Sequence, residues 1–394
     1  MPSDKTSNPV IPLARWADRQ LRLLADETRS NAIASLRGET LLGERAALNG
    51  FTVPARRSAG RKCHLLAAKG GWFALNLARD ADRDLLPALF ETRMLDTRDL
   101  GEIAELVFDR DLAQLVARGR EMGLAVAGSN EAPAAPAHAT ITRATPCERP
   151  DRAPLVLDLS ALWAGPLCSH LLQQAGAQVI KIESATRPDA MRSGDPEFFA
   201  LLNQAKDNVA LDLRSSDGRD ALIGLIAKAD IVIEAARPRA LLQLGIDADA
   251  LVSAKPGLTW ITITGHGAQG EPANWIGFGD DCGVAGGLTH ALEQATGASG
   301  FVGDAIADPL TGITAARCAW AAHSSGQGGR IGLSMSAIVA QALADERAHA
   351  PGDLETDLAH WASIAGKPCP AVERHAIQSA PRALGADNAR WLAC

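Results

Sequence analysis

The second half of the chain alternates between short apolar runs and stretches with helical periodicity. The runs, rich in β-branched residues, are residues 155–159, 177–183, 208–213, 230–235 and 258–265. The stretch 215–229 between two of them has a helical pattern, with Ser215 or Ser216 as its N-cap. This alternation predicts an α/β fold, with right-handed βαβ units forming a Rossmann-like, mostly parallel sheet flanked by helices. Ligands of such sheets bind beyond the carboxyl ends of the strands, so the turn at residues 161–166 is a candidate site.

The first part of the chain predicts a smaller α+β unit over residues 1–127. A helical run covers residues 13–35, and two amphipathic helices are expected near residues 82–91 and 99–119. Residues 63–77 predict a hairpin whose turn contains Lys69, Gly70 and Gly71.

Residues 128–152 are rich in proline and small residues and predict an extended linker. Residues 153–394 then form the Rossmann-like domain with a C-terminal tail. Within this domain, residues 277–300 are rich in glycine and less regular, and a helix is expected from Asp308 to about Ala322.

Composition and charge narrow the class of protein. The chain has 394 residues, 47% of them hydrophobic, and a formal net charge of −7, which argues against a nucleic-acid partner. It has no apolar stretch approaching a membrane span, and its N-terminus lacks the apolar segment of a secretory signal. The seven cysteines are scattered without a CxxC pair, and the nine histidines show no paired-ligand spacing. We therefore expect a cytoplasmic protein without a membrane association or a metal.

Three stretches of the second half carry a family resemblance. "LDLSALWAGPLCSHLLQQAGAQVIKIE", "LNQAKDNVALDLRSSDGRDALIGLIAKADIVIEAARPRALLQLGID" and "DAIADPLTGITAA" resemble the family III (CaiB/BaiF) CoA-transferases, the group of formyl-CoA transferase, carnitine CoA-transferase and α-methylacyl-CoA racemase. The resemblance covers roughly residues 155–336. The first 127 residues are similar to the small domain of the family, which typically lies downstream. The chain therefore looks circularly permuted, or like the surviving end of a tandem fusion.

The resemblance implies coenzyme A, or an acyl-CoA substrate, as the ligand. Contacts of the family fall on the turn residues Leu162, Trp163 and Ala164, and further on Leu211, Arg214 and Arg237. The helix that starts at Gly165 and Pro166 offers free N–H groups to a phosphate. From the residues alone, Trp163 either lies against the CoA or packs at the sheet edge, and each arginine either meets a phosphate or is a solvated surface charge.

Departures from the family pattern weaken this expected CoA site. Ser184, Ala235 and Gln243 stand where the family usually has polar or cationic partners of CoA. We therefore expect CoA to bind, but more weakly or in an altered way.

The catalytic group is the largest departure. Transferases of the family use an aspartate nucleophile, whose position falls at or near Thr296, and the racemase pair of the family maps to Asp308 and close to Phe278. The acids that remain nearby are Asp280, Asp281, Asp304 and Asp308. Each can act as a nucleophile or base if it is desolvated; alternatively, the first two end a loop and Asp308 caps a helix. The nearest candidate bases are His266 and His290.

Two classes of function stay open. One is a CoA-transferase-like enzyme that moves CoA between an acyl-CoA and a small carboxylic acid through an aspartyl intermediate, or an acyl-CoA racemase or isomerase. The other is a non-catalytic CoA-binding or subunit homologue. The resemblance also implies a homodimer. Because a single linker joins the two parts, the interlocked rings typical of the family are not expected here.

Overall fold

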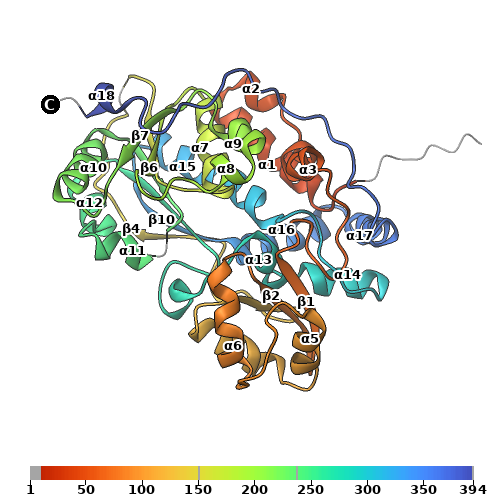
Figure 1. Ribbon diagram of the computed structural model, residues 1–394. Helices are drawn as coiled ribbons and strands as arrows, with labels where there is room; N and C mark the ends of the chain where they lie inside the picture. The colour runs from red at the N-terminus through yellow and green to blue at the C-terminus, as the bar shows by residue number, and fades with distance from the viewer. Residues whose placement is uncertain (1–9, 150, 237, 393–394) are drawn as a thin grey trace, which may run out of the picture.

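The computed structural model describes residues 10–149, 151–236 and 238–392 (Figure 1). Its larger sheet has seven strands in the order β4-β10-β9-β8-β5-β6-β7. The strands are β4 (His138–Thr142), β5 (Leu155–Asp158), β6 (Gln178–Ser184), β7 (Asp207–Leu211), β8 (Ile231–Glu234), β9 (Thr259–Thr264) and β10 (Gly329–Ser334). All neighbours pair in parallel except β4, which is antiparallel to β10. Strands β6 and β7 are added on one side of β5, and strands β8, β9 and β10 on its other side, so the strand order has a switch point between β5 and β8. This topology confirms the Rossmann-like prediction.

Helices cover both faces of this sheet, which explains why its strands are apolar at nearly every position. One face, with Val156 and Ile233, packs under α7 (Ala164–Gln174) and α15 (Ala307–Ser324). The other face, with Leu157 and Trp260, packs under α10 and α12. The helices that follow strands β6 to β8 are α8 (Met191–Gly194), α9 (Pro196–Asn203), α10 (Ser216–Lys228), α11 (Pro238–Gln243) and α12 (Ala248–Ala254). Ser215 is the N-cap of α10, which decides between the two serines that the sequence offered, Ser215 and Ser216.

The first three helices pack against the large sheet's helices rather than with the small sheet. They are α1 (Ala14–Thr28), α2 (Asn31–Ala34) and α3 (Gly38–Leu48), and α1 lies against α15 and α16. Leu21, Leu24 and Leu41 are buried in the same core as α7. A Cβ on Gly38 would lie 2.3 Å from the carbonyl oxygen of Ala14, so the two helices approach each other closely there. This packing differs from a single small unit over residues 1–127, because the apolar side of α1 completes the large core.

A second, three-stranded antiparallel sheet forms the small part of the molecule, in orange at the bottom of Figure 1. Its elements are β1 (Cys63–Ala68), β2 (Gly71–Asn76), η1 (Asp80–Leu85), α4 (Leu86–Leu89), α5 (Leu100–Phe108), α6 (Leu112–Glu121) and β3 (Ala125–Gly128). The predicted hairpin forms, and its Gly70 and Gly71 have positive φ angles. The expected helix over residues 99–119 is divided, because Asp111 caps a new helix with its side chain. The other face of the sheet contacts α13 through Ala74 and Val284.

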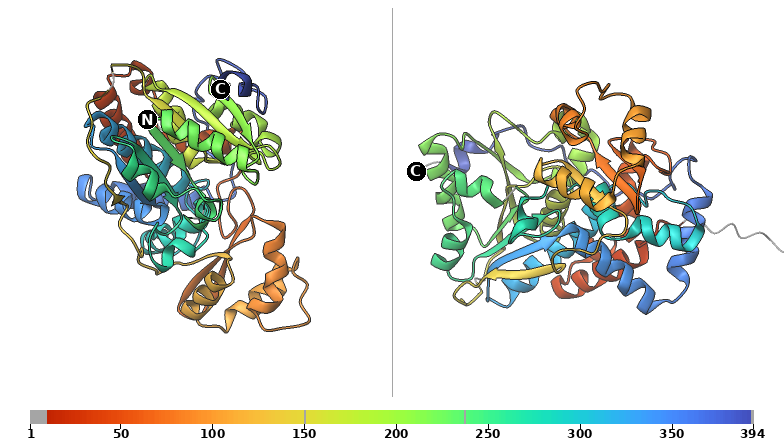
Figure 2. Two further views of the ribbon diagram at one scale, coloured as in Figure 1. Left: turned by 90° about the vertical axis from the view of Figure 1, so that its left-hand side faces the viewer. Right: turned by 90° about the horizontal axis from the view of Figure 1, so that it is seen from below.

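Two segments are more regular than their composition suggested. The proline-rich stretch 128–152 contains β4, which covers one edge of the large sheet (yellow in Figure 2). The glycine-rich stretch 277–300 forms α13 (Gly279–Ala285) and α14 (Leu288–Thr296) after the short η2 (Glu271–Asn274). The chain continues as α16 (Met335–His349), α17 (Asp353–Ser363) and α18 (Asn388–Trp391). Over the described residues, no helix combines the length and the apolar character needed to cross a membrane.

The opposite edge of the large sheet is satisfied by side chains of the C-terminal segment. The backbone N–H of Asn208 on β7 donates to the Asp387 carboxylate at 2.8 Å. The N–H of Ala210 donates to the Asn388 amide oxygen at 2.9 Å, and the Asn388 amide nitrogen donates back to the Ala210 carbonyl at 3.1 Å. Two polar side chains thus replace a further strand beside β7.

Candidate active site at the switch point of the large sheet

A cleft of about 410 Å³ lies at the carboxyl ends of the neighbouring strands β5 and β8, at the switch point of the strand order. The loop after β5, the loop after β8, the segment after β9 and the start of α15 all contribute to its wall. The lining residues include Ala161, Leu162, Ala164, Gly165, Arg187, Ala235, Ala236, Gly265, Gly277, Phe278, Asp308 and Met335. Arg79 reaches it from the small part of the molecule. This is the position at which doubly wound sheets bind their ligands.

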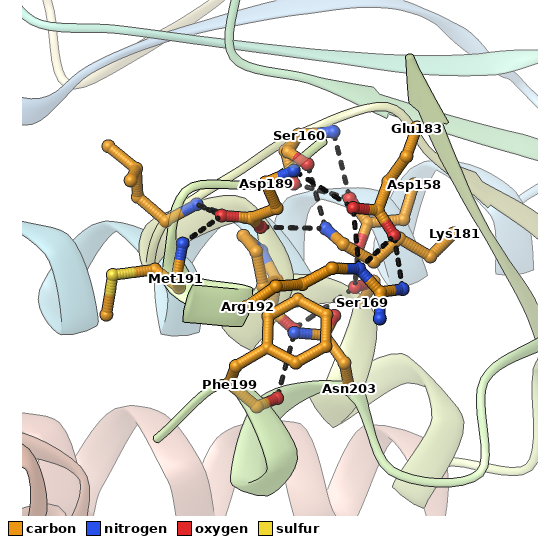
Figure 3. A network of polar contacts seen from close by, with 12 residues as sticks. Asp158, Ser160, Ser169, Lys181, Glu183, Asp189, Met191, Arg192, Phe199 and Asn203 are labelled. Atoms are coloured by element: carbon orange, nitrogen blue, oxygen red, sulfur yellow. Dashed lines mark hydrogen bonds and ion pairs between the residues drawn. The ribbon is translucent and has the colours of Figure 1, made fainter. Parts of the chain in front are cut away.

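A buried polar network holds the turn after β5 (Figure 3). Asp158 ends β5 and accepts hydrogen bonds from Ser160 and, at 2.5 Å, from Ser169. The Lys206 ammonium lies 3.1 Å from the same carboxylate, and both groups are almost fully buried. Burial alone would raise the pKa of Asp158, but Lys206, Lys181 and the hydroxyl donors hold this pKa well below its usual range. Asp158 is therefore a structural anion rather than a reactive group.

A second buried pair fixes the backbone of the turn. The Lys181 ammonium lies 3.1 Å from Asp189 and donates to the Ser160 carbonyl at 3.0 Å. Asp189 in turn accepts a hydrogen bond from the N–H of Leu162 at 3.3 Å. Leu162 adopts a φ of 68°, which is costly for a residue with a branched side chain, so these contacts stabilise a conformation that the turn would otherwise avoid. The side chain of Leu162 remains 38% exposed, at the cleft.

The predicted CoA-contacting residues are distributed between the cleft, the core and the surface. Leu162 and Ala164 line the cleft. Trp163 is buried, with its ring 4.9 Å from that of Phe198, and Leu211 is buried in the core at the end of β7. The side chain of Trp163 thus packs within the large core.

The predicted arginines lie differently. Arg214 is exposed and donates to the Thr186 hydroxyl at 2.9 Å, while Arg237 lies outside the described residues. Arg187, on the same loop as Thr186, lines the cleft and was not singled out from the sequence. The signal for it was available, because it stands three residues after Ser184, where the family usually has an arginine.

Of the four candidate acids, Asp308 lines the cleft. It stands in the first turn of α15, one residue after its start, and accepts a hydrogen bond from the N–H of Ala164 at the start of α7. Asp281 caps α13 and accepts from the N–H of Phe278 at 3.1 Å and from the Asn76 amide at 2.6 Å. Asp281 thus caps a helix, whereas the sequence alternative for this pair was the end of a loop and helix capping was expected of Asp308.

The remaining two acids share one guanidinium with Asp308. Arg45 of α3 lies 3.2 Å from Asp304, which is buried, and Asp280 accepts a hydrogen bond from the N–H of Ala305 at 3.1 Å. Burial raises the pKa of Asp308 to about 7; Arg45 opposes this rise, and the nearby Asp280 and Asp304 reinforce it. Burial likewise raises the pKa of Asp304 to about 6. Arg45 therefore faces these three carboxylates and, more weakly, that of Asp195, and this charge deficit keeps the proton affinity of the three high.

The other sequence candidates lie outside the cleft wall, apart from Phe278. The Thr296 hydroxyl donates to the Leu292 carbonyl at 2.7 Å at the end of α14. His290 is exposed on α14, and His266 is buried behind the cleft beside Cys282. Arg45 was missed by sequence reasoning, because it is far from the acids along the chain and no motif contains it.

Comparisons with known proteins identify a family for the residues that form the large sheet. The model of CoA-transferase family III matches residues 154–357. A succinyl-CoA–D-citramalate CoA-transferase of Chloroflexus aurantiacus is 33% identical over 184 residues, covering 44% of this chain and 46% of that protein. A succinate–glutarate CoA-transferase of Agrobacterium fabrum is 28% identical over 208 residues, covering 48% and 52%. The chain thus spans about half the length, or less, of the curated relatives it matches.

Among solved structures, a Mycobacterium tuberculosis protein, Rv3272, is similar at a TM-score of 0.46 and 26% identity. The match covers 53% of this chain and 61% of that one.

Proposed function

Because the chain belongs to CoA-transferase family III, we propose that it binds a CoA thioester in the switch-point cleft and transfers the CoA to a small carboxylic acid. The observation that carries this proposal is the position of Asp308, a carboxylate that lines the cleft beside the start of α7. In this reading Asp308 takes the role of the aspartate that is absent at Thr296.

Binding of the CoA moiety is supported by charge at the cleft. Arg187 lines the cleft, and Arg214 lies on the neighbouring loop, joined to Thr186 at 2.9 Å. Both guanidinium groups suit the phosphates of CoA. The start of α7 adds backbone N–H groups and a positive dipole end, which favour an anion or a developing oxyanion.

The proposed reaction begins with attack by Asp308 on the thioester carbonyl. The C–S bond breaks, CoA leaves as a thiolate, and an acyl-aspartyl anhydride remains. The thiolate then attacks the aspartyl carbonyl, which releases the donor acid and leaves an aspartyl-CoA thioester. The acceptor carboxylate attacks this thioester and releases the thiolate again. Attack of the thiolate on the acceptor's acyl carbon gives the new acyl-CoA and regenerates Asp308.

A second candidate function is proton transfer at the carbon next to the thioester, as in an acyl-CoA racemase or isomerase. The observation that favours it is the raised pKa of Asp308, about 7, which suits a group that both accepts and donates a proton near neutral pH. A third possibility is a CoA-binding protein without catalysis, in which Asp308 only fixes the start of α7.

One set of experiments separates the three. Purified protein is mixed with succinyl-CoA and related acyl-CoAs, and the intact mass is measured after hydroxylamine or borohydride trapping. Transfer predicts a trapped product on Asp308 that Asp308→Asn lacks, with a rate loss of about 10³-fold or more. Asp304→Asn, which changes a carboxylate of the same cluster outside the cleft, is the matched control and keeps the adduct.

The other outcomes identify the alternatives. Deuterium exchange at the α-carbon without an adduct favours the racemase or isomerase. CoA binding in calorimetry, with neither adduct nor exchange, favours the binding protein. No binding at millimolar CoA contradicts all three, because a ligand of the native state must raise its stability.

The arrangement of the parts leads to a further proposal about assembly. The small sheet precedes the family-matched residues 154–357, and we place it in the permuted position of the family's small domain. Since a single segment, residues 128–152, connects the two parts, a homodimer of this chain is separable rather than interlocked. Tagged and untagged dimers are mixed under native conditions and then separated by size-exclusion chromatography. A separable dimer predicts that mixed dimers form from chains with an intact backbone.

A further inference from the structure

A buried cluster behind the cleft contains three side chains with metal-ligating atoms. A ring nitrogen of His266, a carboxylate oxygen of Asp281 and the Sγ of Cys282 all lie within 4.8 Å of one another. The three residues are at most 2% exposed. They come from two separate elements, the segment after β9 and the first turns of α13, so the fold rather than a local motif brings them together.

The histidine is oriented as metal-ligating histidines commonly are. His266 makes a hydrogen bond to the backbone of Ile276, while its Nε2 has no hydrogen-bond partner among the described residues. Nε2 is thus the ring nitrogen that has no partner in the described part of the chain and is available to a cation. A buried ring nitrogen without a partner is costly, and a cation at Nε2 would remove that cost.

The carboxylate and the thiol are held toward the same place. Asp281 is oriented by the Asn76 amide at 2.6 Å and the Phe278 N–H at 3.1 Å, the outer contacts that ligating carboxylates usually have. A Cβ on Gly277 would lie 2.5 Å from the Cys282 Sγ and 3.1 Å from the His266 Nε2. The sulfur and the nitrogen thus both approach one backbone position that no side chain fills.

We propose that His266 Nε2, the Asp281 carboxylate and the Cys282 thiolate bind a divalent zinc-like ion. Nitrogen, oxygen and sulfur ligands together suit Zn²⁺, for which bond lengths of about 2.0–2.3 Å place neighbouring ligand atoms roughly 3.3–3.8 Å apart in a tetrahedral site. One thiolate, one carboxylate and a neutral imidazole balance the charge of the ion. On binding, the thiol proton is released to solvent.

The cluster lies next to the cleft. Gly265 and Gly277 line the cleft and also lie against the cluster: a Cβ on Gly265 would be 3.3 Å from the Cys282 Sγ. Three protein ligands with a fourth position on the cleft side are the pattern of an open metal site rather than a closed structural one. The site does not rest on the proposed CoA transfer.

The test is a titration of the full-length, chelator-treated protein with Co²⁺ as the probe. The wild-type chain is expected to bind one equivalent, with a thiolate-to-cobalt charge-transfer band that excess Zn²⁺ abolishes. Cys282→Ser removes the band, and His266→Gln loses the one-to-one saturation. Asn76→Ala, which removes a contact to a ligand, weakens the affinity by roughly 10- to 100-fold.

Two cysteine controls separate the site from adventitious binding. Cys168→Ser changes an equally buried thiol of α7, and Cys147→Ser changes an exposed one; both must keep the band. Thermal unfolding with and without Zn²⁺ gives an independent readout, with stabilisation of the wild type and none of His266→Gln. Absence of the band in the wild type, its persistence in Cys282→Ser, or its loss in Cys147→Ser overturns the proposal. If Cys282→Ser does not fold, the thermal shift of His266→Gln decides.

Discussion

Two groups of buried charges, one around Asp158 and one around Asp308, are balanced in opposite ways. In the network around Asp158, Lys206 lies 3.1 Å from Asp158. Lys181 lies 3.1 Å from Asp189, and Figure 3 shows this lysine with both carboxylates. In the cluster at the cleft, the carboxylates of residues 280, 304 and 308 share the guanidinium of Arg45, which Asp195 also faces.

The consequence is a difference in proton affinity at similar burial. The paired cation keeps the pKa of Asp158 low, whereas the cation deficit lets burial raise the pKa of Asp308 to about 7. Burial alone does not decide whether a carboxylate is structural or reactive; the ratio of cations to anions around it does.

The largest expected effect is the loss of a cation from the balanced network. Lys206→Met leaves Asp158 buried with one partner fewer, and we expect a loss of about 3–5 kcal/mol in the free energy of unfolding. Urea denaturation measures it. Lys62→Met, at an exposed lysine, should stay within about 0.5 kcal/mol of the wild type. In the double variant Asp158→Leu/Lys206→Met much of the loss should be recovered; a purely additive double variant would contradict the pairing.

For the cluster at the cleft, replacing a charged group is expected to raise the free energy of unfolding at alkaline pH rather than lower it. Asp308 has a pKa raised from 3.8 to about 7, so the folded state binds its proton more tightly than the unfolded state does. The stability that this proton supplies is complete below pH 4 and is lost as the pH rises toward 7. Asp308→Asn lacks this loss, and at pH 8 it should be more stable than the wild type by roughly 2–4 kcal/mol, with little difference at pH 4.

Urea denaturation of the two proteins from pH 4 to pH 8 checks this difference. A variant that is less stable than the wild type at pH 8 would show that Asp308 is held by a cation that the structure assigns elsewhere. Together with the adduct experiment, the expected result is a variant that gains stability and loses activity, the exchange commonly found at reactive sites.

The smallest expected effect is a shift of the pH profile when the one cation of the cluster is removed. If Asp308 reacts as an anion, kcat/KM rises with pH through about 7. Arg45 lowers this pKa, so Arg45→Gln should move the rise to higher pH by about one unit, equivalent to about 1.4 kcal/mol. Arg317→Gln, at a half-buried arginine paired with Glu27 at 2.9 Å, is the matched control and leaves the midpoint unchanged. A fall in rate over the same range would assign Asp308 the role of an acid.

The same contrast explains what could be predicted from the sequence. The strands β5 to β9 were predictable, because parallel strands buried on both faces leave continuous runs such as residues 177–183. The edge strand β4 was not: it lies in a proline-rich stretch, and one sheet edge needs only a few half-buried residues to be paired. Likewise, the place of α1 in the large core depends on an apolar stripe that fits either part of the molecule.

For the candidate site, local sequence named acids that the structure brings close together, but not their partners. Asp308 was among the named acids because a stretch around it resembles a family motif. Its distinction from Asp281 depends on Asn76, which caps the latter from a strand about two hundred residues away. The burial of Trp163 beside Phe198 and the approach of Arg45 are likewise long-range contacts. Such pairs leave no trace in spacing or periodicity.

The two polar side chains beside β7 also bear on the behaviour of this protein in solution. An uncovered outer strand presents a row of unpaired N–H and C=O groups to any other extended chain, including another copy of itself. Asp387 and Asn388 form hydrogen bonds with the backbone groups of Asn208 and Ala210, which prevents a strand of another molecule from pairing there. The segment at the start of α18 thus opposes self-association of the protein into extended β-assemblies.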